Sequence, residues 1–194
     1  MKVRSSLIKR KTKETDIELE LKLDGAGLLQ GSSGIGFFDH LLELLARHSG
    51  FSLDLKAIGD LQVDFHHTVE DIGLCLGQAL REALGDKKGL NRYASIILPM
   101  DEVLVLCALD LSGRPGYYGE FSFQSSQIGN FATELMEEFF RAFVNEAKIT
   151  LHLRQLTQGN SHHLAEALIK ALARALQDAV CVTGDRIPSS KGVL

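Results

Sequence analysis

The chain has 194 residues, of which 45% are hydrophobic and 24% are charged, an ordinary balance for a protein with one full-sized core. Its net charge of −4 gives no reason to expect nucleic acid or an anionic membrane as a partner. A few local Arg or Lys residues could still hold a small anionic substrate.

The cysteines and the N-terminus indicate the cellular compartment in which the protein is expected. Cys75, Cys107 and Cys181 lie far apart in apolar runs and form no CxxC pair, so we expect buried free thiols in a reducing environment. The basic N-terminus has no apolar segment behind it, so a secretory signal is not expected. The longest apolar run, 103–109, is too short to span a bilayer. We therefore expect a cytoplasmic protein.

The first half of the chain predicts two strands and two helices around a glycine-rich segment. Residues 15–23 alternate apolar and charged side chains, which is typical of a strand with one solvated face. The glycines of 25–36 do not fit a nucleotide-binding spacing and predict turns and a short strand. Residues 37–48 have helical apolar spacing, 51–57 alternate again, and 66–85 form a second helix.

The second half repeats this order. Strands are expected at 103–111, 117–123 and 149–153, and helices at 130–147 and 160–182. Each half then contains strand, strand, helix, strand and helix. We predict an α+β sandwich in one domain, 1–194, built from duplicated ββαβα halves at about 1–89 and 90–194. Its helices would pack between or against mixed β-sheets.

One motif occurs once in each half. His66-His67-Thr68-Val69-Glu70 returns as His162-His163-Leu164-Ala165-Glu166, and both copies open an apolar helical segment. Residues four apart share a helix face, so His66 and Glu70 can reach one ion, as can His162 and Glu166. Because His67 and His163 project elsewhere, each helix is expected to serve two metal ions.

Alignment of the repeats adds one ligand to each half. When the strand 51–55 is placed on 149–153, His40 falls on Glu138, and both lie on the preceding helix. Eight ligands would then serve two ions at four apiece, leaving open positions for substrate. Imidazole and carboxylate without thiolate suit Mn, Fe, Zn, Co or Ni, and six-coordination favours Mn or Fe. The divergent histidines suggest metal between subunits, hence a homo-oligomer.

Isolated histidines carry less information than the repeat. A lone histidine on a helix is usually a surface or capping residue. His48 follows His40 on roughly the same helix face, so it either reaches the site or caps the helix end. His152 alternates with apolar neighbours and is expected on a strand surface.

Long motifs of one known family recur across nearly the whole chain. They are Gly36-Phe37-Phe38-Asp39-His40-Leu41-Leu42, Gly59-Asp60-Leu61, Asp64, His66-His67-Thr68-Val69-Glu70-Asp71, Leu76-Gly77-Gln78-Ala79-Leu80, Asn160, His162-His163, Glu166-Ala167, Lys170-Ala171 and Pro188-Ser189-Ser190-Lys191-Gly192. Together they resemble imidazoleglycerol-phosphate dehydratase in its monofunctional form. The resemblance implies a Mn²⁺-dependent lyase of histidine biosynthesis that converts imidazole glycerol phosphate to imidazole acetol phosphate. It also implies a 24-subunit shell built from trimers, with manganese pairs shared between subunits.

The resemblance assigns roles to individual residues. The metal ligands it implies are His40, His66, His67, Glu70, His162, His163 and Glu166, and Glu138 stands where many members have His. Glu14 is the candidate acid/base, and we take His48 with it as a candidate catalytic residue. The positions that match substrate and phosphate binding are Arg92, Arg114, Ser189, Ser190 and Lys191, and Lys170 is expected to line the same pocket.

Two other functions fit the metal motif. A di-metal hydrolase would use a metal-bound hydroxide and would need no C-terminal Ser-Ser-Lys. A metal-assembled, non-enzymatic shell or storage protein would use the ions only to join subunits.

Overall fold

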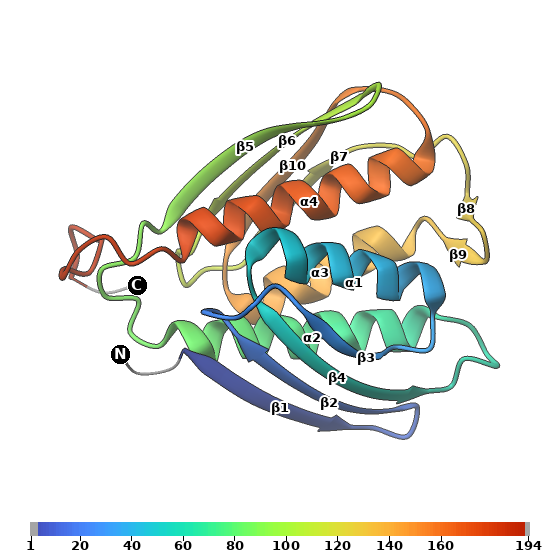
Figure 1. Ribbon diagram of the computed structural model, residues 1–194, viewed down its shortest axis with the longest axis horizontal. Helices are drawn as coiled ribbons and strands as arrows, with labels where there is room; N and C mark the ends of the chain where they lie inside the picture. The colour runs from blue at the N-terminus through green and yellow to red at the C-terminus, as the bar shows by residue number, and fades with distance from the viewer. Residues whose placement is uncertain (1–3, 193–194) are drawn as a thin grey trace.

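The computed structural model describes residues 4–192 and places a layer of helices between two four-stranded sheets (Figure 1). The first sheet has the order β1-β2-β4-β3, and the second has the order β5-β6-β10-β7. The strands are β1 (Ser5–Lys11), β2 (Thr15–Lys22), β3 (Leu29–Ser32), β4 (Ser52–Gly59), β5 (Tyr93–Met100), β6 (Val103–Asp110), β7 (Gly116–Glu120) and β10 (Thr150–Thr157).

The two sheets have the same topology. In the first, β1, β2 and β4 are antiparallel and β3 runs parallel to β4; in the second, β5, β6 and β10 are antiparallel and β7 runs parallel to β10. This repetition confirms the duplicated α+β fold with mixed sheets.

Four helices fill the layer between the sheets in residues 4–192. They are α1 (Gly36–Ser49), α2 (His66–Leu84), α3 (Leu135–Ala147) and α4 (Ser161–Ala179). Each helix packs on one from the other half, α1 on α4 and α2 on α3, so the halves share one core. No helix in this part of the chain has the length and apolar character needed to cross a bilayer.

Each four-stranded sheet contains one strand that the sequence pattern did not predict, β1 in the first and β5 in the second. In β1, five of the seven residues are serine, lysine or arginine and only Ile8 is buried, so period-two alternation is hidden. In β5, the inward residues are half-buried and the outward ones include Tyr93 and Ile97, so both faces are apolar. Both are edge strands, where tertiary pairing rather than hydrophobic alternation decides the structure.

The helix expected at 130–147 begins later than predicted. Gln127–Ile128 and Phe131–Ala132 form a two-stranded hairpin, β8 and β9, and α3 starts at Leu135. Phe131 lies four residues before Leu135, a helical spacing, but the structure buries it from the hairpin instead. Gly129 at the turn has φ +60°, a left-handed conformation that glycine adopts without strain.

The cysteine prediction holds for two of three residues. Cys75 and Cys107 are buried free thiols, and burial raises their pKa values to about 11 and about 12. Cys181 is exposed, so its predicted burial is wrong. It follows Val180, the residue that caps the end of α4, and lies beyond the helix face that packs on the core.

Candidate functional site

Three of the predicted ligands meet where α1 crosses α4. Oε1 of Glu166 lies 2.8 Å from Nε2 of His40 and 2.9 Å from Nε2 of His162. One nitrogen or oxygen from each residue lies within 4.8 Å of the other two, a grouping that can hold a metal ion. The other Glu166 oxygen accepts from Nζ of Lys170 at 2.6 Å. Lys170 therefore touches the same cluster, and its place in the substrate pocket stays a prediction.

The Glu166 carboxyl is buried yet held in its ionised form. Burial alone would raise its pKa, but hydrogen bonds from Lys170, His40 and His162 outweigh burial and lower it to about 2. A buried carboxylate between two imidazoles is a donor set suited to a divalent transition metal.

Both HHxxE motifs open their helices with the same local structure. The side chain of Asp64 accepts a hydrogen bond from the backbone N–H of His66 at 2.8 Å, and Asn160 accepts from that of His162 at 2.8 Å. Each hydrogen bond satisfies a backbone N–H at the start of its helix; Asn160 is the N-cap of α4, whereas the N-cap position of α2 is Phe65. Nε2 of His66 lies 3.8 Å from Glu70, so the predicted pairing of residues four apart is present in both halves.

His67 and His163 point away from these pairs. Nδ1 of His67 lies 2.9 Å from Asp60, and its Nε2 lies 3.9 Å from Glu14. Nδ1 of His163 lies 2.9 Å from Glu102. These contacts raise the pKa of both imidazoles, with the carboxylate hydrogen bond as the largest cause.

Glu102 belongs to a second group of potential ligands that the sequence analysis did not identify. It lies with Asp101 and His163, and their donor atoms lie within 4.8 Å of one another. A backbone N–H of Asn160 and the His163 ring lower the pKa of Glu102 to about 2. The signal in the sequence was positional, because Glu102 precedes β6 as Glu14 precedes β2.

Glu138 lies on α3 but is not joined to the cluster. It is half-buried, and within residues 4–192 no hydrogen bond or ion pair links its side chain to His66, His67 or Glu70. Its helix packs against α2, as the helix of His40 packs against α4. Glu138 and His40 therefore lie on helices that pack in equivalent ways, as the repeat alignment predicted. The role of Glu138 as a metal ligand stays a prediction.

The two candidate catalytic residues lie beside different parts of the site. Glu14 is exposed at the β1–β2 turn, near His67. His48 lies on α1, where burial, followed by the positive charges of Lys170 and Arg174, lowers its pKa. His48 is therefore a neutral imidazole at neutral pH.

The predicted phosphate residues come from three segments at one end of the molecule. Arg92 is buried, and its guanidinium donates to both oxygens of Asp110 at 2.7 and 3.1 Å and to the carbonyl of Pro188 at 2.6 Å. It thereby ties the segment with Ser189, Ser190 and Lys191 to the second sheet. Arg114, Ser190 and Lys191 are exposed.

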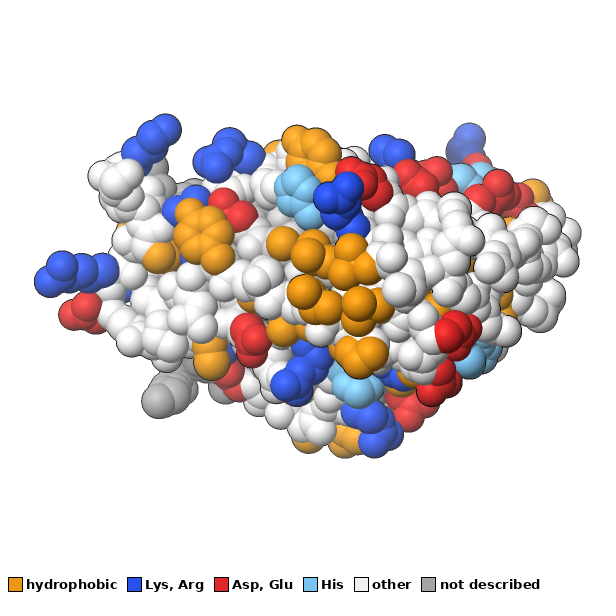
Figure 2. Space-filling model, turned by 90° about the horizontal axis from the view of Figure 1, so that it is seen from above, with side chains coloured by type: hydrophobic (Ala, Val, Ile, Leu, Met, Phe, Trp, Pro, Cys, Tyr) orange, Lys and Arg blue, Asp and Glu red, His pale blue; other side chains and the backbone are white. Residues whose placement is uncertain are grey.

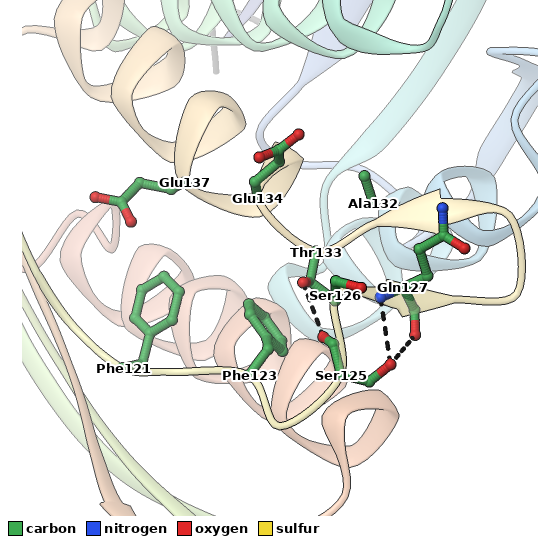
Figure 3. A pocket seen from close by; sticks show the side chains of 9 residues that line it. All are labelled: Phe121, Phe123, Ser125, Ser126, Gln127, Ala132, Thr133, Glu134 and Glu137. Atoms are coloured by element: carbon green, nitrogen blue, oxygen red, sulfur yellow. Dashed lines mark hydrogen bonds between the residues drawn. The ribbon is translucent and has the colours of Figure 1, made fainter.

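Cavities surround the β8–β9 hairpin. One of about 480 Å³ lies between α3 and the segment before β8, lined by Phe121, Phe123, Ser125, Glu134 and Glu137 among others (Figure 3). It contains none of the predicted site residues. Cavities of about 340 and 360 Å³ include His66 and His162 respectively, and Gln127 lines all three. The hairpin therefore lies between the two HHxxE motifs. Neither the hairpin nor its position was predicted from the sequence.

Comparisons with known proteins agree with one another. Residues 33–176 match the family model described as imidazoleglycerol-phosphate dehydratase. A protein of that name from Moorella thermoacetica is 58% identical over 193 residues, covering 98% of each chain, and one from Rhodopseudomonas palustris is 52% identical over 195 residues, covering 99% of each. A solved dehydratase structure from Staphylococcus aureus is similar with a TM-score of 0.85, 39% identity and coverage of 92% of this chain and 99% of that one. The structure of an IGPD from Pyrococcus furiosus is similar with a TM-score of 0.80 and 35% identity, and the match covers 96% of this chain and 100% of that one.

Proposed function

Since this chain belongs to the imidazoleglycerol-phosphate dehydratase family and is a dehydratase of histidine biosynthesis, we propose that it converts D-erythro-imidazole glycerol phosphate to imidazole acetol phosphate and water at paired manganese ions. The observation that carries the metal-dependent part of this proposal is the Glu166 carboxylate, held between imidazole nitrogens of α1 and α4. The metal-dependent hydrolase and the non-enzymatic shell find no comparable support.

The residues present fit manganese. Their donors are imidazole nitrogens and carboxylate oxygens without thiolate, a set that accommodates Mn²⁺. His40, His162 and Glu166 would hold one ion, and His66 and Glu70 with Glu138 would supply the equivalent donors of the other half. His67 and His163, which point away from these groups, would contribute to ions shared with neighbouring subunits.

The substrate's hydroxide is a poor leaving group, and the proton to be removed lies on carbon. Bound Mn²⁺ would supply a Lewis acid for the imidazole nitrogen of the substrate. Glu14 would move the proton through its exposed carboxylate, which faces Nε2 of His67 at 3.9 Å. Neutral His48 can accept a proton on the side of the site that contains Lys170 and Glu166.

The substrate phosphate would bind where the cations gather, at the opposite end of α4 from His162, so one substrate would take its metal ligands and its phosphate contacts from different subunits. Arg114 offers a guanidinium fork, and Lys191 with Ser189 and Ser190 adds a charge and two hydroxyl donors. Arg92 would contribute by holding their segment in place through the Pro188 carbonyl. Lys170, 16% exposed, would contact the substrate closer to the metal ligands.

A homo-oligomer completes the proposal, and the family resemblance implies 24 subunits built from trimers. Hydrophobic side chains gather at the centre of the outer face of the second sheet, with charged and histidine side chains around them (Figure 2). In that sheet Ile97 is 62% exposed and Tyr118 is 56% exposed. An apolar sheet face of this kind favours burial against another copy of the chain.

The test starts from metal-free protein. Adding Mn²⁺ should restore turnover of imidazole glycerol phosphate and raise the mass measured by light scattering. Assembly without turnover would support the shell protein instead. Turnover that survives His66→Ala combined with His162→Ala would exclude the metal mechanism.

A further inference from the structure

In both halves a carboxylate holds the second histidine of the motif at the same ring nitrogen. Oδ2 of Asp60 lies 2.9 Å from Nδ1 of His67, and Oε2 of Glu102 lies 2.9 Å from Nδ1 of His163. A neutral imidazole that donates from Nδ1 carries its free lone pair on Nε2. Each carboxylate therefore selects the tautomer and fixes the plane of its ring.

The two carboxylates come from different places in the repeat. Glu14 and Glu102 are equivalent, because each directly precedes the second strand of its half. Glu102 takes Nδ1 of its histidine, whereas Glu14 approaches only Nε2, at 3.9 Å. In the first half Asp60, the residue after β4, takes Nδ1 instead. The residue after β10 is Gln158, which has no charge to offer.

Within residues 4–192, Asp60 differs from Glu102 in that one of its carboxylate oxygens is buried without a hydrogen bond. Its side chain is 15% exposed, and Oδ1 is buried without a hydrogen-bond partner in the described part of the chain. An unpartnered buried polar atom costs about 1–3 kcal/mol. Asp60 serves neither neighbouring element, since β4 ends at Gly59 and Asp64 accepts the hydrogen bond from the first N–H of α2. The contact that Asp60 does make is with the ring of His67.

We propose that Asp60 and Glu102 are positioning residues that orient His67 and His163 so that Nε2 of each faces a metal ion. Asp60 thereby leaves Glu14, the counterpart of Glu102, free for proton transfer. The inference rests on the proposed function, because it requires both histidines to be metal ligands. Carboxylates behind metal-binding histidines set ring orientation and raise ligand basicity in many metalloproteins.

The test measures metal affinity rather than turnover. Mn²⁺ is titrated into metal-free, full-length protein, and free Mn²⁺ is followed by electron paramagnetic resonance. Asp60→Asn and Glu102→Gln should each weaken binding about ten- to a hundredfold. Asp54→Asn, an exposed carboxylate on β4, is the matched control and should change affinity less than twofold.

His67→Ala and His163→Ala test whether the histidines bind metal, separately from whether Asp60 and Glu102 position them. If these variants lose affinity while Asp60→Asn and Glu102→Gln bind like wild type, the positioning role is wrong and the proposed metal site stands. If His67→Ala and His163→Ala bind like wild type, the proposed ligand set is wrong. Thermal unfolding of each metal-free variant checks folding, and should Asp60→Asn fail to fold, Glu102→Gln on its exposed hairpin decides the question.

Discussion

The two sheets share their strand order but differ in the polarity of their outer faces. On the first, Lys9, Glu18 and Lys56 lie side by side on β1, β2 and β4 and form ion pairs. The equivalent positions of the second sheet hold Ile97, Leu106 and Arg154. The inner faces are alike and apolar, because both cover helices. The duplicated fold thus fixes the inner face, while the surroundings of each sheet decide the outer one.

The helix pairs differ in a similar way. Gly73 and Gly77 of α2 take the repeat positions of Ile169 and Ala173 in α4. A Cβ at Gly77 would lie 2.3 Å from the carbonyl oxygen of Phe143, so α2 and α3 pack with their backbones close together. The HHxxE residues nevertheless occupy matching places at the helix starts. The ligand contacts differ between the halves, because Nε2 of His66 lies 3.8 Å from Glu70 and Nε2 of His162 lies 2.9 Å from Glu166.

The largest predicted effect comes from removing the motif carboxylate of either half. Glu70→Gln and Glu166→Gln should each lower turnover more than a hundredfold, beyond the loss typical of an outer-sphere residue. Steady-state kinetics with saturating Mn²⁺ measures this, and Glu43→Gln, an exposed carboxylate on α1, is the control. If only one of the two variants is impaired, the halves do not contribute equally.

Assembly should depend on one sheet face only. Leu106→Glu places a charge in the apolar face of the second sheet and should yield smaller species in analytical ultracentrifugation. Glu18→Leu, its counterpart in the first sheet, should leave the mass unchanged. The reverse pattern would place the contact between copies on the other sheet.

Helix spacing predicts a smaller, structural difference. Gly77→Ala forces a methyl group against backbone atoms of α3 and should cost about 2 kcal/mol, or roughly 4–8 °C in the unfolding temperature of the metal-free protein. Gly36→Ala is the same substitution at a helical glycine of α1 where an added Cβ would meet nothing within 4 Å among residues 4–192, so it should not lower stability. Equal losses measured by calorimetry would contradict the closer packing of α2 on α3.

The smallest effect concerns pH. Hydrogen bonds and charges from Lys9 and Lys56 lower the pKa of Glu18 below 4.5. A carboxyl with a lowered folded-state pKa stabilises the fold above its unfolded pKa, and this contribution is lost as pH falls through the folded value. The free energy of unfolding of wild type should therefore slightly exceed that of Glu18→Gln near neutral pH, and this difference should disappear as the pH falls below 4.5. A difference that is constant down to acid pH would exclude the ion pairs.

Sequence reasoning predicted what repeats locally and missed what depends on tertiary pairing. The HHxxE motifs, their helices and the equivalence of His40 and Glu138 followed from helical spacing and repeat alignment. That His40 meets Glu166 of the second motif did not, because it depends on the packing of α1 against α4. The β8–β9 hairpin was missed because Phe131 fits a helical pattern, and β1 because its charges hide the alternation. The role of Asp60 depends on a contact with His67 across a loop, which spacing alone does not specify.

The most direct test counts manganese ions while activity returns. Metal-free protein is titrated with Mn²⁺, and bound ions per chain and turnover of imidazole glycerol phosphate are measured on the same samples. Two matched half-sets of ligands predict that turnover reaches its maximum at two bound Mn²⁺ per chain. Full turnover before any Mn²⁺ is bound, or saturation at a single ion per chain, would contradict the account.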